Sequence, residues 1–437
     1  MRRFAMISPY FPPSSFVGAK RALTFCRNLP ANGWTPSVIT LPVHIERDAD
    51  LEPLIPDVPT YRHYRTGPID TWMTRKELNA KPKPFGDNRG HTTHSKGIWR
   101  QIKKELTSLP FDRYAKFIPW AKKGCQRFIE SQQCDLIHVN AGPFSGLILG
   151  TMLSKQTGLP LVLDLRDPWA HDPIYSDAWG VMGTALAKKI EKWAFTQASR
   201  VVMNSESAVS LYREAYSGVL PSTHFEVIRN HFDEALYDPL PTPPGADGPF
   251  RVIFFGHLTP LRNGQLFFEA WRRFIDRENL VAGDAILLTL GERTQVDDDA
   301  VEALELSDFV GRETWQPFIR SRQLLGTADV LLDLTSPRHG LRIAGKLYDY
   351  LCARRPILSV SNNPEVAQIH ADAQVGHCVA HDVDAIVDAL CDLYRRKRAG
   401  TKFQPNLDVV HQFSAGPAAA KMARIFNEVV GHEDPAL

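Results

Sequence analysis

FAMISPYFPPSSFVGAKRALTFCRNLPANGWTPSVITL, residues 4–41, contains one complete strand–helix–strand unit. The apolar run Phe4–Ser8 predicts a buried strand, and residues 37–41 predict a second one. Between them, apolar residues from 19 to 29 recur on one face of a helix, which ends near Gly33 as a helix with a glycine C-cap does. A helix between two apolar strands is typical of a βαβ unit, whose parallel strands are buried on both faces.

The same alternation continues along the chain. In the first half, strands are predicted at 136–139, 161–165, 201–204 and 225–228, with helices at about 144–157, 183–199 and 206–216. Asp238–Pro249 then has five prolines and two glycines in twelve residues, a composition that neither a helix nor a central strand accepts. Beyond it, strands are predicted at 252–255, 286–290, 330–334 and 357–360, with helices near 264–277, 314–326, 345–353 and 383–398.

These elements predict an α/β protein with two doubly wound, Rossmann-like parallel-sheet domains that face a central cleft. The N-terminal domain is expected at 1–240 and the C-terminal domain at 241–405. Residues 406–437 are expected to form a C-terminal helix that packs back on the N-terminal domain. Because ligands of such sheets bind outside the carboxyl ends of the strands, the cleft is the expected site.

Composition excludes several classes of protein. Lys and Arg number 51 against 49 Asp and Glu, a net charge of +2 that is too balanced for a dedicated nucleic-acid binder. The six cysteines are scattered without a CxxC pair, which favours a reducing cytosol over a disulfide framework or a structural zinc site. The apolar stretch after Arg3 is shorter than the core of a signal peptide, and no apolar run is long enough to span a bilayer. We expect a cytoplasmic protein, either soluble or held peripherally at the inner face of the cell membrane.

Residues 61–127 fit neither sheet and are predicted to be an insertion. Their segment 96–127 has nine Lys or Arg against two acidic residues, a net charge of +7, and interleaves these charges with aromatic residues such as Trp99 and Trp120. Such a segment either contacts an anionic membrane or a lipid-linked acceptor, or packs on the first domain as a helix with a solvated basic face.

Five motifs in a fixed order carry a resemblance to a known family. They are Asp135-Leu-Ile-His138, Asp164-Leu-Arg-Asp-Pro-Trp169, Val227-Ile-Arg-Asn230 with Asp233, Phe255-Gly-His-Leu-Thr-Pro-Leu-Arg262, and Gly345-Lys-Leu-Tyr-Asp-Tyr-Leu351 before Arg355-Pro-Ile-Leu358. Over nearly the whole chain they resemble the retaining family-4 (group 1) glycosyltransferases of the GT-B fold. The resemblance implies an acceptor-binding first domain, a second domain that binds a nucleotide sugar, and transfer of the sugar with retention to a polysaccharide or lipid-linked acceptor. It calls for no cofactor and no metal ion.

The first donor-binding candidates follow the strand that ends at Phe255. Arg262 lies before a helix start near Gly264, where a fixed cation beside an anion-seeking helix end suits a diphosphate. The resemblance supports this contact and includes Gly256 in the same loop. A second basic residue of the family is replaced by His257, which either binds the donor or is a loop histidine bonded to the backbone.

Lys346 and Asp349 lie three residues apart on one face of a helix that starts near Gly345. The ammonium group is expected to contact the diphosphate, and the carboxylate is expected to accept hydrogen bonds from ribose hydroxyls. The alternative is a surface ion pair between the two. The family's motif has two glutamates eight positions apart, and Leu341 stands where the first of them is expected.

In the first domain, residues 11–20 lead into a helix N-terminus, where Gly18 either lets a phosphate approach or is a packing glycine. His138, Arg166 and Asp167 end strands, and burying them unpaired would be costly, so we expect them to position the acceptor. An Arg166–Asp167 ion pair is the alternative. The predicted catalytic residues are Arg262, Lys346, His138 and Asp167; the donor-binding residues are Gly18, Gly256, His257, Arg262, Lys346 and Asp349; and the acceptor-binding residues are Lys20, Arg21 and Arg166.

No metal site is predicted, because the acidic run 297–299 suits a helix start and His91 and His94 lack a third ligand. Two other functions remain open. One is a nucleotide-sugar epimerase on the same fold, which converts its donor without an acceptor. The other is a catalytically degenerate subunit that binds sugar nucleotides, which Leu341 suggests. The expected partners are a nucleotide-sugar donor, the acceptor and an anionic membrane, and not nucleic acid.

Overall fold

The computed structural model describes residues 1–14, 16–40, 49–62, 110–112, 114–236, 245–259, 262, 264–314, 316–336 and 340–431. Most of the predicted insertion 61–127 therefore lies outside the described residues. The described residues form two compact units: those within 1–230 together with the segment that begins at Ala415, and those within 231–414. The sequence predicts these boundaries at 240 and 405. In the structure residues 231–236 and 406–414 belong to the second unit, where an isolated β-bridge joins Phe232 to Ser414.

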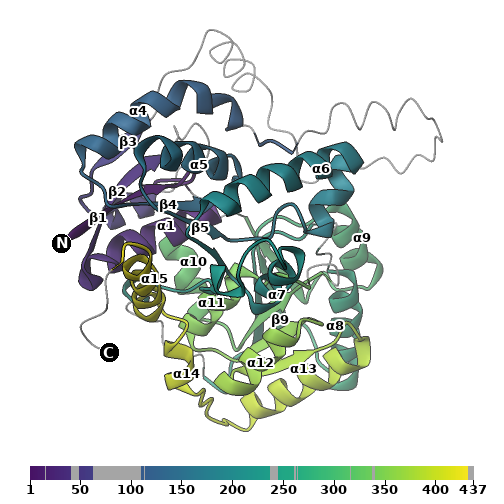
Figure 1. The fold of residues 1–437 in the computed structure, drawn as a ribbon. Coiled ribbons are helices and arrows are strands. Elements are labelled where there is room, and N and C mark those ends of the chain that lie inside the picture. Colours follow the sequence, from purple (N-terminus) through teal and green to yellow (C-terminus); the bar gives the residue numbers. More distant parts are fainter. Residues whose placement is uncertain are drawn as a thin grey trace, which may run out of the picture. The chain divides into compact units, whose positions relative to one another are not determined.

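The first unit is built on a seven-stranded parallel sheet with the strand order β3-β2-β1-β4-β5-β6-β7 (Figure 1). Its strands are β1 (Arg2–Ile7), β2 (Trp34–Thr40), β3 (Thr60–Arg62), β4 (Leu136–Ala141), β5 (Leu161–Leu165), β6 (Arg200–Met203) and β7 (Phe225–Val227). Its helices are α1 (Val17–Asn28), α4 (Ile118–Ser131), α5 (Ser145–Thr157), α6 (Pro173–Gln197), α7 (Glu206–Ala215) and α15 (Ala415–Val429), with short 3₁₀ helices at Pro30–Asn32, Ala49–Leu54, Ala115–Phe117 and Ser222–His224.

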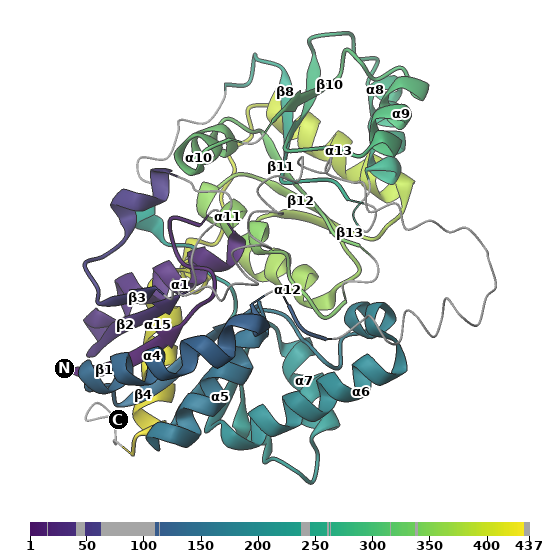
Figure 2. The ribbon, with the colours of Figure 1, turned by 90° about the horizontal axis from the view of Figure 1, so that it is seen from above.

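Helices cover both faces of this sheet, so its central strands are buried on both sides, as their continuous apolar sequences predict. Helices α4, α5, α6 and α7 pack on one face. Helices α1 and α15 pack on the other, and Figure 2 shows them beside each other. The C-terminal helix is held there by Phe426, which packs against Phe4, and by Asn427, whose side-chain oxygen accepts a hydrogen bond of 3.0 Å from the Trp34 indole.

Helix α6 starts ten residues before the predicted position. Pro173 occupies its first turn, and the side chain of Asp172 accepts a hydrogen bond from the Ile174 N–H at 2.9 Å. Both are ordinary helix-start signals. Gly180, with a φ of 73°, interrupts the helix. Because of this glycine, the sequence does not show that the first turns and the rest form one element.

The second unit is a six-stranded parallel sheet with the order β10-β9-β8-β11-β12-β13. Its strands are β8 (Phe250–Phe255), β9 (Ala285–Leu290), β10 (Val310–Glu313), β11 (Val330–Leu334), β12 (Ile357–Val360) and β13 (Gly376–Val379). Its helices are α8 (Gln265–Arg277), α9 (Gln295–Ala303), α10 (Phe318–Gly326), α11 (Gly345–Ala353), α12 (Pro364–Ala373), α13 (Val383–Arg398) and α14 (Leu407–His411), with a 3₁₀ helix at Glu234–Leu236.

The predicted fold class, two doubly wound parallel-sheet α/β units, is confirmed. Each sheet reverses its strand order at one point, between β1 and β4 in the first unit and between β8 and β11 in the second. In open α/β sheets, ligands bind outside the carboxyl ends of the strands at such a point. A ligand site is therefore expected at this point in each unit.

Candidate functional site

The second unit places two cationic side chains at the carboxyl ends of β8 and β11. The Nζ atom of Lys346, in the first turn of α11, is buried and lies 3.7 Å from the ring centroid of Phe254. Neither this atom nor the Nε atom of Arg262, which is also buried, has a hydrogen-bond partner among the described residues. Burial lowers the pKa of Lys346 well below its ordinary value, and the charge of Arg262 lowers it further, while Asp333 opposes both.

Two glycines allow the loops around these cations to pack closely. Gly256, which follows β8, has a φ of 112°, and Gly291, which follows β9, has a φ of 139°. A Cβ atom at Gly291 would lie 2.7 Å from the carbonyl oxygen of Gly256, a clash with backbone. A Cβ atom at Gly256 would lie 4.0 Å from the Nζ atom of Lys346. Only glycine fits at 291, and Gly256 lines the space next to the Lys346 amine.

Helix α11 begins without a side-chain cap, since Ala344 is its N-cap residue and no acidic residue lies in its first turn. The N–H groups of a first helical turn have no partner within the helix and carry the positive end of the dipole. At the start of helix α8, in contrast, a side chain accepts a backbone hydrogen bond: the N–H of Gly264 donates to Asp297 at 2.8 Å. Asp297 also completes a capping box at the start of α9, as a helix-start acid is expected to do.

In the structure Asp349 pairs with a cation other than Lys346. Its carboxylate pairs with Arg322 of α10 at 3.1 Å, and the guanidinium of Arg322 in turn lies over the rings of Phe255 and Phe318. Among the described residues, Lys346 and Asp349 therefore do not form the alternative surface ion pair, since the Nζ atom of Lys346 has no hydrogen-bond partner. Asp349 is positioned by α10, beside the same sheet edge.

His257 is bonded to the backbone. Its Nδ1 atom accepts a hydrogen bond of 2.9 Å from the N–H of Glu292, so the proton of the neutral ring resides on Nε2. The N–H of Leu258 donates to the Glu292 carbonyl at 2.9 Å, which joins the loops after β8 and β9 a second time. His257 thus holds the loop that carries Gly256.

In the first unit, the space in front of Gly18 is filled by the guanidinium of Arg166. A Cβ atom at Gly18 would lie 2.7 Å from the Cζ atom of Arg166. Arg166 donates to the Ala141 carbonyl at 3.2 Å and to the carbonyl of Gly142. Gly18 is therefore a packing glycine in this structure, and the cation at this helix start is Arg166. Burial lowers the pKa of Arg166, and the neighbouring charge of Asp167 opposes this.

Arg21 and His138 lie inside the layer between the sheet and α1. Arg21 binds Asp164 through two hydrogen bonds of 2.8 Å and donates to the carbonyls of Ile228 and Arg229. The His138 ring is fully buried, with its Nε2 atom 3.6 Å from an oxygen of Asp164. These placements differ from the predicted contacts of Arg21 and His138 with the acceptor, because both side chains point into the core.

Burial would raise the pKa of Asp164, but Arg21 and His138 outweigh it and lower this pKa to about 2. Lys20 and Asp167 are half-buried, and Asp167 lies next to Arg166, whose charge it balances. The structure thus brings Arg262, Lys346 and Gly256 together in the second unit, and Arg166, Asp167 and Gly18 together in the first.

A buried carboxylate that the sequence analysis did not identify fixes the loop after β5. Glu191 of α6 accepts hydrogen bonds from the Ala170 N–H (2.9 Å) and from the hydroxyls of Tyr212 (2.8 Å) and Tyr216 (3.0 Å), and lies 2.8 Å from Nδ1 of His171. Burial and the charge of Glu191 raise the pKa of both tyrosines. No periodic or motif signal marks a single glutamate of a helix as the centre of such a network.

Tyr212 links this network to the loop, because its hydroxyl also accepts a hydrogen bond of 2.8 Å from the N–H of Trp169. Replacing Tyr212 by phenylalanine should lower the free energy of unfolding by about 1–3 kcal/mol, since a buried N–H and a buried carboxylate both lose a partner. Tyr216→Phe removes only one bond to Glu191 and should cost less. Denaturant unfolding of both variants measures this, and equal losses would show that the Trp169 contact contributes nothing.

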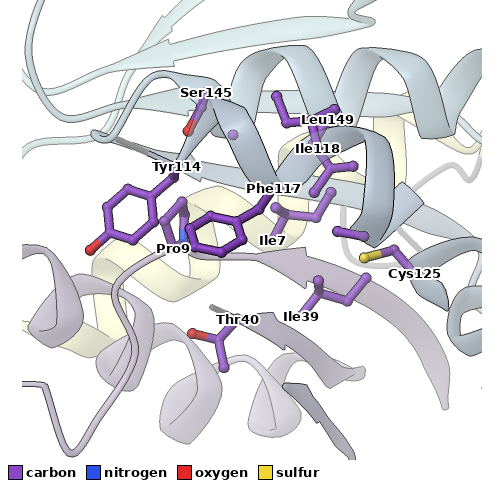
Figure 3. Close-up of a pocket in the computed structure, with 12 residues that line it drawn as sticks. Ile7, Pro9, Ile39, Thr40, Tyr114, Phe117, Ile118, Cys125, Ser145 and Leu149 are labelled. Carbon is purple, nitrogen blue, oxygen red and sulfur yellow. The ribbon is translucent and has the colours of Figure 1, made fainter. Parts of the chain in front are cut away.

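Two hollows in the described residues lie away from these cations. A small apolar cavity of about 20 Å³ in the first unit is lined by Ile39, Phe117, Ile118 and Leu149, and Figure 3 shows the Tyr114 hydroxyl pointing away from it. A basic groove of about 1060 Å³ in the second unit lies at the amino ends of β11, β12 and β13. The first is too small for a sugar, and the second is at the opposite end of the strands from Lys346.

Comparisons with known proteins agree with this architecture. Residues 86–236 match the model of a family described as Glycosyltransferase Family 4. None of the curated proteins matches the chain significantly. The expected resemblance to GT-B glycosyltransferases is confirmed, although not its retaining chemistry: residues 86–236 match a glycosyltransferase family, and the two parallel-sheet units have the GT-B fold.

Solved structures match in fold over nearly the whole chain. HepE from Anabaena, in complex with UDP and glucose, is 14% identical, with 98% of this chain and 100% of that chain covered and a TM-score of 0.62. Sucrose-phosphate synthase from Thermosynechococcus elongatus is 14% identical, with 99% and 100% covered and a TM-score of 0.66. A structure described as a UDP-N-acetylglucosamine 2-epimerase from Listeria monocytogenes is 11% identical, with 99% and 97% covered and a TM-score of 0.56. At these identities the likeness concerns the fold alone.

Proposed function

We infer that the chain transfers a sugar from a nucleotide-diphosphate donor, bound at Lys346 and Arg262 in the second unit, to a polysaccharide or lipid-linked acceptor. The observation that carries this inference is the buried Lys346 amine, which has no hydrogen-bond partner among the described residues. A buried cation without a partner is costly unless a ligand supplies one. Its place at the carboxyl ends of β8 and β11 is where such sheets bind ligands.

The charges and the helix start select the diphosphate as the group that is bound here. A diphosphate carries several negative oxygens, which the ammonium of Lys346, the guanidinium of Arg262 and the first turn of α11 complement. HepE, which shares the fold, has been solved with UDP and with UDP-glucose. This favours a uridine nucleotide as the first donor to test.

Catalysis would then consist chiefly of stabilising the leaving group. When the bond between the sugar and the diphosphate breaks, negative charge develops on the departing phosphate oxygen, next to Lys346 and Arg262. The acceptor hydroxyl attacks from the same face as the departing group, as the resemblance to retaining enzymes implies. Arg166 and Asp167 are the residues of the first unit that we assign to acceptor positioning.

A thermal-shift screen of nucleoside diphosphates and their sugars tests the donor site. A ligand at about 100 times its Kd should stabilise the protein by about 2.7 kcal/mol. Donor consumption is then measured with and without candidate acceptors. Consumption that requires the acceptor supports transfer, whereas conversion of the donor alone would favour the epimerase function, and binding without turnover would favour the degenerate subunit.

Turnover is expected to be independent of divalent metal. Among the described residues, no group of three or more His, Cys, Asp or Glu side chains could hold a metal ion. The proposed counter-charges of the diphosphate are Lys346 and Arg262 instead. Rates measured in EDTA should equal those in magnesium or manganese; a loss in EDTA that only added metal restores would contradict this.

The segment 96–127 is proposed to contact an anionic membrane or a lipid-linked acceptor on the cytoplasmic side. Within its described part, Trp120 is 64% exposed at the start of α4, close in sequence to Lys122 and Lys123. No helix in the part of the chain that the structure describes is long and apolar enough to cross a membrane.

Replacing Lys103, Lys104, Lys122 and Lys123 by glutamine should therefore weaken binding to liposomes that contain anionic lipid, by about 1 kcal/mol for each charge near the surface. The loss should diminish as salt is added, because salt screens the charges of the unmodified protein. Co-sedimentation with liposomes measures the effect. Equal partitioning of the variant and the unmodified protein would favour the alternative, in which this segment is a helix with a solvated basic face.

A further inference from the structure

We propose that Asp333 is a positioning residue of the donor site, which holds one proton jointly with Lys346 so that the lysine meets the diphosphate as an ammonium group. This proposal rests on the proposed donor site. It concerns a carboxylate that neither the sequence motifs nor the family resemblance identifies. Asp333 is completely buried, and its carboxylate would repel the negative oxygens of a diphosphate, so it acts on the donor through its cationic neighbours.

Three buried polar atoms lie at one sheet edge, one on a carboxylate and two on cations. The Oδ1 atom of Asp333, the Nζ atom of Lys346 and the Nε atom of Arg262 are each buried without a hydrogen-bond partner in the described parts of the chain. Asp333 belongs to β11, and Lys346 starts the helix α11 that packs on the same face of the sheet. Buried polar groups are normally satisfied, so three unsatisfied ones mark a site that a ligand completes.

The other side of Asp333 faces neutral groups. Ser359, its register partner on β12, places its hydroxyl 3.5 Å from Oδ2, and Nε2 of His370 lies 2.8 Å from that hydroxyl. Burial lowers the pKa of His370 to about 4 and raises that of Cys378, on β13, to about 11. Burial also raises the pKa of Tyr350, on α11. All three are therefore uncharged near neutral pH.

The charge state of Asp333 is consequently set by two cations. Burial raises the pKa of Asp333, and Lys346 and Arg262 oppose this. For Lys346, burial and Arg262 lower the pKa, and Asp333 opposes this. Whether the proton resides on the carboxylate or on the amine, the pair keeps one proton, and an arriving diphosphate favours the amine as its carrier.

Removing the carboxylate breaks this arrangement. In Asp333→Asn, Lys346 lies beside Arg262 without a counter-charge, so its pKa falls further and the empty site holds a neutral amine at high pH. Diphosphate binding then requires a proton from solvent, and its Kd should rise by about tenfold for each pH unit above the pKa of Lys346. A carboxylate that merely repelled the diphosphate would give the opposite result, tighter binding at every pH.

The test is calorimetric titration of the full chain with inorganic pyrophosphate from pH 6 to 9. The titration of pyrophosphate itself is common to all proteins, so the difference between the variant and the unmodified protein carries the result. Asp333→Asn is expected to bind similarly at pH 6 and at least tenfold more weakly at pH 9. Lys346→Met should bind weakly throughout, and adding Asp333→Asn to it should change nothing further.

Asp329→Asn is the matched control, because Asp329 pairs with Lys397 at 2.6 Å at the opposite end of the same strand. Its pyrophosphate affinity should equal that of the unmodified protein at every pH. Failure of the unmodified protein to bind pyrophosphate or UDP would overturn the donor site itself. Binding by the unmodified protein, with an unchanged or tightened pH profile in Asp333→Asn, would overturn the role of Asp333 alone.

A second measurement uses only the unmodified protein, so it does not depend on whether a variant folds. Titrations of the unmodified protein in buffers of different ionisation enthalpy report the protons taken up on binding. The account predicts no uptake at pH 8 beyond that of pyrophosphate, since the pair already holds its proton. Uptake of about one proton would overturn the proposal, because it would show that Lys346 enters the complex from a neutral state.

Discussion

Replacing Asp164 by asparagine is expected to lower the free energy of unfolding by about 3–5 kcal/mol, the range for removing one partner of a buried ion pair. Asp164 is fully buried and binds Arg21 through two hydrogen bonds of 2.8 Å. The variant leaves the Arg21 guanidinium in the core without a negative partner. Denaturant unfolding followed by circular dichroism measures the loss.

Asp276→Asn is the control, since Asp276 pairs with Arg272 on the surface and its side chain is 63% exposed. Exposed pairs of this kind contribute about 1 kcal/mol or less. A loss below 1 kcal/mol for Asp164→Asn would contradict the account, because it would mean that Arg21 finds another partner or reaches solvent.

The pH dependence of stability provides an independent check on Asp164. Its pKa in the folded protein is about 2, below its ordinary value of 3.8. A carboxylate with a lowered pKa contributes stability above its unfolded pKa, and this contribution is lost as the pH falls through the folded value. The unmodified protein should therefore lose about 2 kcal/mol from this group between pH 4 and pH 2, and Asp164→Asn should lack this part of the loss.

Replacing Lys346 by alanine is expected to lower kcat and kcat/KM together, by ten- to a hundredfold, or about 1.5–3 kcal/mol. The reason is that the contact with the diphosphate strengthens as the leaving group gains charge in the transition state. Arg262→Ala should behave alike. If the Asp349 carboxylate also accepts hydrogen bonds from the donor ribose, as the sequence predicts, Asp349→Asn should act mainly on the KM of the donor, because such a contact forms equally in the ground and transition states.

Steady-state kinetics with the donor selected by the thermal-shift screen measures these changes. Lys402→Ala is the control, since Lys402 lies in the basic groove at the other end of the strands. If both cation variants kept the unmodified kcat/KM while folded, the diphosphate assignment would be wrong. A large loss in Lys402→Ala would instead place the donor in the basic groove.

Much of the fold could be predicted because its central strands are buried on both faces. Strands such as β5 and β11 are short, continuous apolar runs, and the structure has them where the sequence predicts them. The edge strands β3, β10 and β13 were not predicted. Half-exposed residues make up most of β13, so it lacks the apolar run by which a buried strand is identified.

The site was predictable in part, for a related reason. The cations Arg262 and Lys346 follow strand ends within motifs of a known family, so their positions could be inferred. The aspartates within the apolar strands LVLDL (161–165) and VLLDL (330–334) look identical in sequence. Their roles depend on partners in other elements, Arg21 of α1 for Asp164 and Lys346 of α11 for Asp333, which only the folded structure brings together.

The proposed function requires that the second unit binds the diphosphate of a nucleotide sugar at Lys346. Calorimetric titration with UDP of the unmodified protein, Lys346→Ala and Lys402→Ala measures this binding. The account predicts saturable binding at one site, weakened at least tenfold in Lys346→Ala and unchanged in Lys402→Ala. Equal UDP affinity in Lys346→Ala and the unmodified protein, with both folded, would contradict it.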